Sequence, residues 1–310
     1  MSLNILFAAG ASRWNYYEHP LRDALKTAGM SAHLAMDIAP DEVDYIIYAP
    51  DSAVQDFTPY TRARAVLNLW AGVEGIVGNE TLHIPLTRMV DPGLSKGMVE
   101  WVSAHVLRYH LGIDLDICRD EPIWEPRLPP LAQERHISVL GLGALGTAVA
   151  QQLLGLGFRV TGWSRSPKDV AGVKCLHGAK GLEQALAQAE IVVLLLPNTA
   201  ETQNTLNAQT LALMPRGAFV INPGRGPLID DAALLAALDG GQIAHATLDV
   251  FRVEPLPPGD PYWTHPKVTV TPHIAAETRA VTASQVVVEN IRRGEDGKPF
   301  LNLVDRDLGY

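Results

Sequence analysis

The amino-acid sequence predicts an α/β protein that contains two open parallel sheets. Apolar runs of strand length alternate with helix-length segments along most of the chain, which is typical of parallel strands joined by covering helices. The chain has 310 residues, more than one hydrophobic core usually organises, and 47% of them are apolar. We therefore expect two domains, each with a substantial core.

The first part of the chain has the pattern of an open α/β unit. Its expected strands are Leu3–Gly10, Val43–Ala49, Ala65–Leu69 and Ile84–Met89. A helix is expected at His19–Ala28, between the first two strands. Pro92 and Gly93 then interrupt the alternation, and apolar side chains at helical spacing predict a long helix over Ser95–Tyr109. A domain boundary is therefore expected after residue 94.

The alternation of strands and helices becomes strict from His136 onward. The expected strands are Ile137–Gly141, Arg159–Trp163, Ile191–Leu196, Ala218–Asn222, Ala244–Asp249 and Val268–Thr271. The expected helices are Leu145–Leu156, Leu182–Gln188, Leu206–Met214 and Asp230–Asp239. Because these strands are apolar on both faces, they fit a parallel sheet covered by helices. A long final helix, expected over Ala275–Arg293, can return to the first unit. We therefore expect domains at 1–94, 95–279 and 280–310, with the last segment rejoining the first.

The segment 114–130 differs from the rest of the chain. It contains Pro122, Pro126, Pro129 and Pro130, with Trp124 among them. Proline at this density excludes a regular helix and favours an extended segment. Two interpretations remain open, a linker and an arm that clasps a partner subunit.

Composition and charge disfavour several classes of function. The formal net charge of −9 disfavours nucleic acids and anionic membranes as partners, because both repel an acidic surface. An anionic substrate would need local positive charge for the same reason. Leu3–Gly10 lacks the basic leader of a secretion signal, and Ile191–Leu196, the most apolar run, is too short to span a bilayer. Cys118 and Cys175 lie far apart without metal-ligand spacing, so we expect a cytoplasmic protein with no metal site.

A G-x-G-x-x-G motif follows the first strand of the second domain. Its residues are Gly141, Leu142, Gly143, Ala144, Leu145 and Gly146. A strand precedes the motif and a proline-free helix follows it, which is the context that dinucleotide binding requires. The first glycine allows the tight turn, the second lets the backbone approach a pyrophosphate, and the third lets helix and strand pack closely. We interpret the motif as a dinucleotide-binding loop, with a plain glycine-rich turn as the alternative.

The end of the next strand indicates which dinucleotide is bound. NAD-selective sites usually carry an acidic residue about 20 residues after the motif, bonded to the ribose hydroxyls. The chain has no acid between Thr161 and Lys168. Ser164, Arg165 and Ser166 offer hydroxyl and guanidinium donors instead, which suit a 2′-phosphate. NADP is therefore the predicted cofactor, and a solvated turn with a surface arginine is the alternative.

Further polar residues follow the later strands. Pro197 and Asn198 end the strand 191–196, either beside the adenosine half of the cofactor or in a simple turn. Arg225 stands between two glycines after the strand 218–222, where a guanidinium can fork onto a carboxylate. In open α/β sheets ligands bind at the carboxyl ends of the strands. Arg225 is therefore a candidate to bind an anionic substrate.

Three more candidates belong to the same edge of the predicted sheet. Asp249 ends a strand and can accept a hydrogen bond from a nicotinamide carboxamide. Glu254 follows it closely, and His273 comes after the strand 268–271, where it is expected to open the last helix. The convergence of Arg225, Glu254 and His273 on one edge points to a catalytic site more strongly than any of them alone.

These motifs, in this order, resemble the D-isomer-specific 2-hydroxyacid dehydrogenase family, and within it the branch of bacterial glyoxylate/hydroxypyruvate reductases. The resemblance runs from Leu67–Glu74 through the dinucleotide motif to Val304–Arg306. It implies a Rossmann coenzyme domain inserted in a flavodoxin-like substrate domain. It also implies NADPH-dependent reduction of a small 2-oxo acid to the D-2-hydroxy acid. By resemblance His273 is the acid/base, Glu254 its orienting carboxylate and Arg225 the substrate clamp.

The resemblance also assigns substrate and partner contacts. Backbone N–H groups at Ala71, Gly72 and Val73 would hold the substrate carboxylate, and Asp249 matches the carboxamide-binding aspartate. Trp124 lies where related reductases extend an arm to the partner subunit, so we expect a homodimer. Trp70 departs from the family, because many relatives have glycine next to this loop, and a large ring there can narrow the substrate pocket. Two alternatives stay open, a non-enzymatic nucleotide-sensing protein of the same fold and an NAD-linked dehydrogenase.

Overall fold

The computed structural model describes residues 2–117, 122 and 124–309, and the chain divides into two compact units. Unit 1 combines Met1–Leu94 with Glu277–Tyr310, and unit 2 is Ser95–Ala276. The chain therefore passes between the units twice, as expected for an inserted domain. The return lies after Ala276, three residues before the position expected from the sequence.

Unit 1 is built on a parallel sheet with the strand order β2-β1-β3-β4-β5. The strands are β1 (Leu3–Ala8), β2 (Ala32–Ala35), β3 (Tyr45–Tyr48), β4 (Val66–Asn68) and β5 (Leu86–Thr87). This order is that of flavodoxin-like sheets, in agreement with the expectation. The sequence did not predict β2, because this short edge strand buries only Leu34 and lacks an apolar run.

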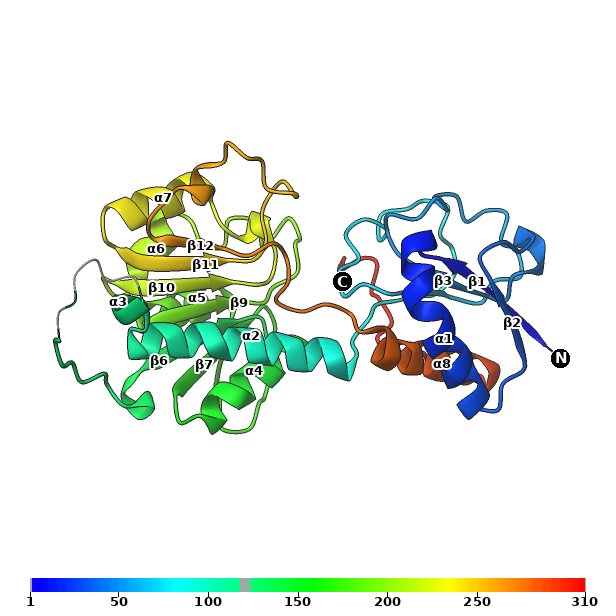
Figure 1. Cartoon of the computed structure of the whole chain (residues 1–310), viewed down its shortest axis with the longest axis horizontal. Helices are drawn as coiled ribbons and strands as arrows, with labels where there is room; N and C mark the ends of the chain where they lie inside the picture. Colours follow the sequence, from blue (N-terminus) through cyan, green and yellow to red (C-terminus); the bar gives the residue numbers. More distant parts are fainter. Residues whose placement is uncertain (1, 118–121, 123, 310) are drawn as a thin grey trace. The chain divides into compact units, whose positions relative to one another are not determined.

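Two helices cover one face of this sheet (Figure 1), α1 (Ala11–Thr27) and α8 (Ala280–Glu295). Leu21 and Leu25 of α1 and Val287 and Ile291 of α8 are buried in the core they share with the strands. Loops that bury Phe57, Ile76, Leu82 and other apolar side chains cover the opposite face. Helix α1 begins eight residues before the predicted start, because its first two turns are mostly exposed and show little apolar periodicity.

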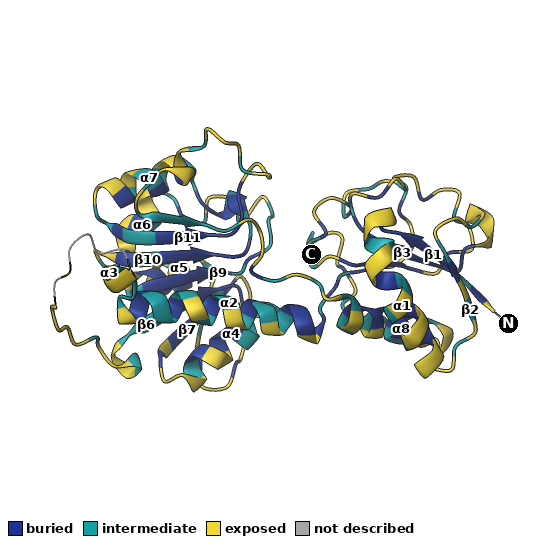
Figure 2. Ribbon diagram, in the orientation of Figure 1, coloured by how far each residue is buried: buried dark blue, intermediate teal, exposed yellow. Residues whose placement is uncertain are grey.

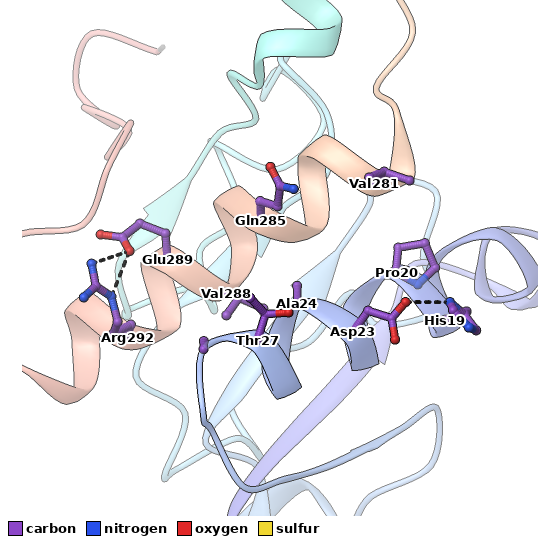
Figure 3. Close-up of a pocket in the computed structure, with 11 residues that line it drawn as sticks. His19, Pro20, Asp23, Ala24, Thr27, Val281, Gln285, Val288, Glu289 and Arg292 are labelled. Carbon is purple, nitrogen blue, oxygen red and sulfur yellow. Dashed lines mark hydrogen bonds and ion pairs between the residues drawn. The ribbon is translucent and has the colours of Figure 1, made fainter.

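A groove runs between α1 and α8 on the surface of unit 1 (Figure 3). Its polar side chains are paired within their own helices, His19 with Asp23 on α1 and Arg292 with Glu289 on α8. These pairs lie at helical spacing on exposed surface, where such ion pairs contribute little to stability.

Unit 2 contains a larger parallel sheet with the order β12-β11-β10-β9-β6-β7-β8. The strands are β6 (His136–Leu140), β7 (Arg159–Ser164), β8 (Lys174–His177), β9 (Ile191–Leu194), β10 (Ala218–Asn222), β11 (Ile243–Leu248) and β12 (Val268–Val270). If the strands are numbered from β6 onward, their order is that of the Rossmann fold, with β12 as one additional strand beside β11. The edge strand β8 was not predicted, because it buries little of its surface.

Helices cover both faces of the unit 2 sheet, and its strands form the buried layer between them (Figure 2). One face carries α2 (Pro92–Leu111) and α4 (Ala144–Gly155). The other carries α5 (Gly178–Ala187), α6 (Ala208–Leu213) and α7 (Asp231–Asp239). A one-turn helix, α3 (Asp114–Ile117), forms the start of the segment 114–130, before the first of its prolines. Single 3-10 turns lie at Pro40–Glu42, Ala132–Glu134, Gly226–Leu228 and Pro261–Trp263.

Because every strand of the larger sheet is parallel, the loops that follow the strands meet at one edge. That edge carries the dinucleotide motif and the later polar candidates. Among the described residues, no helix is both long enough and apolar enough to cross a bilayer.

Candidate active site

His273 and Glu254 form a hydrogen-bonded pair at the carboxyl edge of the unit 2 sheet. His273 Nδ1 lies 2.7 Å from Glu254 Oε2, and Glu254 Oε1 accepts a 2.8 Å hydrogen bond from the Phe251 N–H. The glutamate is thus held by the loop after β11, and it holds the imidazole in turn. Since Nδ1 faces Glu254, Nε2 is the ring nitrogen left for proton exchange with a ligand.

The electrostatics of the pair favour a charged histidine. The hydrogen bond to Glu254 raises the pKa of His273 above its usual value, although partial burial opposes the shift. Burial alone would raise the pKa of Glu254, but the hydrogen bonds from His273 and from the Phe251 N–H outweigh it and lower that pKa. Both shifts favour the charged forms, the imidazolium of His273 and the carboxylate of Glu254.

Arg225 lies in the loop after β10 and adds positive charge to the same edge. Its charge lowers the pKa of both Glu254 and His273, although it is not the main cause of either shift. Asn222 holds the loop, because its Nδ2 donates to the Arg225 carbonyl and its Oδ1 accepts from the Gly224 N–H. A Cβ atom on Gly226 would lie 2.0 Å from the Phe251 carbonyl carbon, so this loop and the Glu254 loop can pack only with glycine there. The structure thus brings Arg225, Glu254 and His273 together.

Asp249 anchors the segment that carries His273. Its buried carboxylate accepts hydrogen bonds from Thr271 Oγ1 and from the N–H groups of Ile274 and Ala275. These contacts use most of the acceptor capacity of a carboxylate, so Asp249 positions the loop after β12. Its contact with a carboxamide stays a prediction.

The expectation that His273 opens the last helix is wrong. The residue has a φ of 54° in the loop after β12, and α8 begins only at Ala280. The hydrogen bonds to Asp249 hold this loop in a non-helical path, and the stretch after it leads to unit 1.

The dinucleotide motif joins β6 to α4 in a form that fits a bound pyrophosphate. A Cβ on Gly141 would lie 2.4 Å from the Leu195 carbonyl oxygen, and one on Gly146 would lie 1.7 Å from that of Gly141. Gly143 faces open space and caps α4 without a side-chain hydrogen bond. The first N–H groups of α4, at Ala144 and Leu145, therefore remain available to a phosphate.

The turn after β7 differs from the sequence interpretation in two respects. Ser164 is buried and its hydroxyl donates to the Ser166 carbonyl, so it stabilises the turn, and its contact with the cofactor stays a prediction. Arg165 forms an ion pair with Glu201, which comes from the loop after β9, at 2.7 Å. Glu201 could not be predicted as a neighbour of this turn, because it lies 36 residues after Arg165 and belongs to another loop.

The loop after β9 begins with Pro197 and Asn198. Asn198 Oδ1 is buried and has no hydrogen-bond partner among the described residues. Because an unpaired buried oxygen is costly, this atom is suited to accept a hydrogen bond from a bound ligand. The observation supports the assignment of this loop to the cofactor site.

The predicted carboxylate-binding loop lies in unit 1, directly after β4. Buried Asn68 holds it by donating from Nδ2 to the carbonyls of Trp70 and Gly72. Within the described part of the chain, the N–H groups of Ala71, Gly72 and Val73 make no hydrogen bond to protein, which leaves them available to an anion. The Val73 side chain is buried in the core, so only its backbone can serve a ligand. The Trp70 ring is partly exposed and lies 5.3 Å from the Arg13 guanidinium, a contact that the sequence did not reveal.

Other expectations concern the proline-rich segment and metals. The Trp124 side chain is 95% exposed. Cys175 is a free thiol, and Cys118 lies outside the described residues. No cluster of potential metal ligands occurs in the described ranges.

A Rossmann sheet with a histidine–carboxylate pair and an arginine at its ligand-binding edge is the arrangement expected of a dinucleotide-dependent dehydrogenase. Residues 118–275 match the family described as D-isomer specific 2-hydroxyacid dehydrogenase, NAD binding domain. A glyoxylate/hydroxypyruvate reductase A of Yersinia enterocolitica is 35% identical over 99% of this chain and 100% of its own.

Solved structures extend this similarity to the whole fold. A D-isomer specific 2-hydroxyacid dehydrogenase of Xanthobacter autotrophicus Py2, in complex with NADPH and MES, is 41% identical, with full coverage of both chains and a TM-score of 0.93. An NADPH-dependent glyoxylate/hydroxypyruvate reductase of Sinorhizobium meliloti, in complex with NADP and sulfate, is 30% identical, again with full coverage and a TM-score of 0.85. The chain belongs to the D-isomer-specific 2-hydroxyacid dehydrogenase family, and its similarity is to the glyoxylate/hydroxypyruvate reductase A branch.

Proposed function

We propose that this protein uses NADPH to reduce a small 2-oxo acid, such as glyoxylate or hydroxypyruvate, to the D-2-hydroxy acid. The observation that carries the proposal is the His273–Glu254 pair beside Arg225, on a sheet whose glycine motif fits a dinucleotide. Similarity to reductases crystallised with NADPH or NADP supports the choice of cofactor.

Different residues of the chain have different roles in the proposed reaction. Bound NADPH supplies the hydride that reduces the carbonyl carbon. His273 holds a proton on Nε2 and delivers it to the carbonyl oxygen, while Glu254 fixes the ring tautomer and favours the charged form. Arg225 attracts the substrate carboxylate, which an acidic protein would otherwise repel. The N–H groups of Ala71, Gly72 and Val73 in unit 1 make no hydrogen bond to protein in the described part of the chain, which supports the role that the family resemblance implies for them in binding a carboxylate.

A turnover assay tests the proposed function. Glyoxylate, hydroxypyruvate and larger 2-oxo acids are each offered with NADPH and with NADH, and oxidation of the nicotinamide is followed by absorbance. We expect turnover of a small 2-oxo acid with a preference for NADPH, and formation of the D product. The variant His273→Gln should lower kcat by about 100-fold or more, the usual range for a general acid.

The assay also decides between enzyme and nucleotide sensor. A nucleotide-sensing protein would bind NADPH and turn over none of these acids. A clear preference for NADH would identify an NAD-linked dehydrogenase. If folded His273→Gln keeps wild-type kcat, another group supplies the proton.

We also infer a cytoplasmic homodimer. The exposed apolar side chains of the segment after α2 support the dimer, because Ile117, Trp124 and Leu128 would otherwise all face water. The free thiol of Cys175 fits a reducing compartment.

A further inference from the structure

An ion pair connects the two loops that flank the dinucleotide motif. Arg165 follows β7 and Glu201 belongs to the loop after β9, and in the sheet these two strands lie on either side of β6. Arg165 Nη1 lies 2.7 Å from Glu201 Oε2. The motif lies between them, because the Gly141 N–H donates to the Trp163 carbonyl on one side and Gly141 packs against Leu195 on the other.

Both partners of the ion pair are accessible, and hydrogen bonds hold the loop that carries Glu201. The Arg165 side chain is 45% exposed and that of Glu201 is 66% exposed. Thr202, the residue after Glu201, donates from Oγ1 to the Pro197 carbonyl and accepts at Oγ1 from the Thr199 N–H. A ligand can therefore reach the ion pair, and Glu201 starts from a defined position.

We propose that Glu201 is a specificity-determining residue of the coenzyme site, whose carboxylate competes with the 2′-phosphate of NADP(H) for the Arg165 guanidinium. The inference rests on the proposed use of NADP(H). A phosphate dianion that approaches Arg165 meets the charge of Glu201 at the same guanidinium, so the carboxylate must withdraw or be repelled. A coenzyme with a free 2′-hydroxyl leaves the ion pair intact. Glu201 therefore weakens the binding of NADP(H) selectively and keeps the preference over NAD(H) moderate.

The expected size of the effect follows from the exposure of the pair. Exposed ion pairs are weak, so the phosphate displaces the carboxylate at small cost. Removing the charge of Glu201 should therefore strengthen binding of a 2′-phosphorylated ligand by about two- to fivefold. Binding of the corresponding ligand without this phosphate should not change.

Calorimetric titration of the full-length protein tests the inference without turnover. The probes are adenosine 2′,5′-bisphosphate and adenosine 5′-diphosphate, at one fixed ionic strength. In Glu201→Gln we expect the Kd of the 2′,5′-bisphosphate to fall by about two- to fivefold. The Kd of the 5′-diphosphate should stay constant. Asp239→Asn is the matched control, because it removes one exposed acid at the end of α7, which lies at the opposite edge of the sheet.

A double-mutant cycle with Arg165→Ala shows whether Glu201 acts through the arginine. Competition predicts that Glu201→Gln loses its effect once Arg165 is absent. An equal gain in both backgrounds would mean simple repulsion of the phosphate and would overturn the inference. Weaker binding of the 2′,5′-bisphosphate in Glu201→Gln would mean that Glu201 orients Arg165. An unchanged Kd would mean that Glu201 has no role in binding. Either result would also reject the competition.

The cofactor proposal and this inference fail in distinguishable ways. If the wild-type protein binds the 2′,5′-bisphosphate no more tightly than the 5′-diphosphate, the proposed preference for NADP(H) is itself wrong. If the wild-type protein shows that preference and reduces 2-oxo acids with NADPH, while Glu201→Gln binds both probes unchanged, only the role of Glu201 is rejected.

Discussion

At the scale of single residues, the site depends on the pairing of His273 with Glu254. An isolated histidine titrates near pH 6.5, but the carboxylate at 2.7 Å raises the pKa of His273. The ring therefore stays protonated further into the neutral range than an isolated imidazole. Reduction requires the protonated ring and oxidation the neutral one.

The pH dependence of the two directions follows from this shift. We predict that kcat/KM for reduction falls as pH rises through the raised pKa of His273, whereas kcat/KM for oxidation rises over the same range. Glu254→Gln removes the charge that favours the imidazolium, so the fall of the reduction rate and the rise of the oxidation rate should both occur at lower pH. Steady-state rates between pH 5 and 9, with buffers of constant ionic strength, provide the measurement. If the pH profiles of the variant and the wild type coincide, Glu254 does not set the pKa of His273.

The same pair contributes to folding stability in a defined pH window. The folded-state pKa of His273 is raised, so its contribution is complete below the unfolded value and is lost as pH rises through the folded value. The lowered pKa of Glu254 acts in the opposite sense, with a contribution present above its unfolded value and lost in acid. The pair therefore stabilises the folded protein most at pH values between the unfolded-state pKa of Glu254 and the unfolded-state pKa of His273.

At the scale of elements, Asp249 connects β11 to the loop after β12. We predict that Asp249→Asn destabilises the fold by about 1–3 kcal/mol, because the amide cannot accept the same hydrogen bonds and leaves a buried N–H unpaired. Since the loop carries His273, kcat should fall as well. Urea unfolding gives the stability and steady-state kinetics give kcat and the KM for NADPH. Thr271→Val is a milder control, because it removes one of the three donors.

The same variant separates two roles of this aspartate. A positioning role predicts loss of stability and of kcat with little change in the KM for NADPH. A role confined to the carboxamide predicts unchanged stability and a raised KM. The second pattern would refute the positioning that we assign to Asp249.

For the whole molecule, the proline-rich segment is the candidate contact between the subunits of the proposed homodimer. If Trp124 completes the partner's site, Trp124→Ala and His273→Gln homodimers are both impaired, each in a different way. Their mixed dimer contains one site with an intact His273 and an intact partner Trp124. Unfolding and refolding equal amounts together should then restore about a quarter of wild-type activity, because half of the dimers are mixed and each has one complete site. No gain over the two separate homodimers would exclude a role across subunits, as would full activity of Trp124→Ala alone.

The sequence was sufficient to predict the fold class and the inserted domain, and it predicted that Arg225, Glu254 and His273 follow strands of one sheet. These features depend on local patterns, since strand periodicity, a glycine motif and residues that follow parallel strands are all visible along the chain. The edge strands β2 and β8 left no such pattern, because they bury little of their surface and tertiary pairing alone holds them in place.

Which distant side chains meet depends on how the chain packs in three dimensions. This packing set Glu201 against Arg165 across the dinucleotide motif and Arg13 beside Trp70. It also placed Asp249 where its carboxylate accepts hydrogen bonds from the loop that carries His273. Such contacts join residues tens of positions apart, and each depends on how strands and loops pack, so no spacing within one segment encodes them.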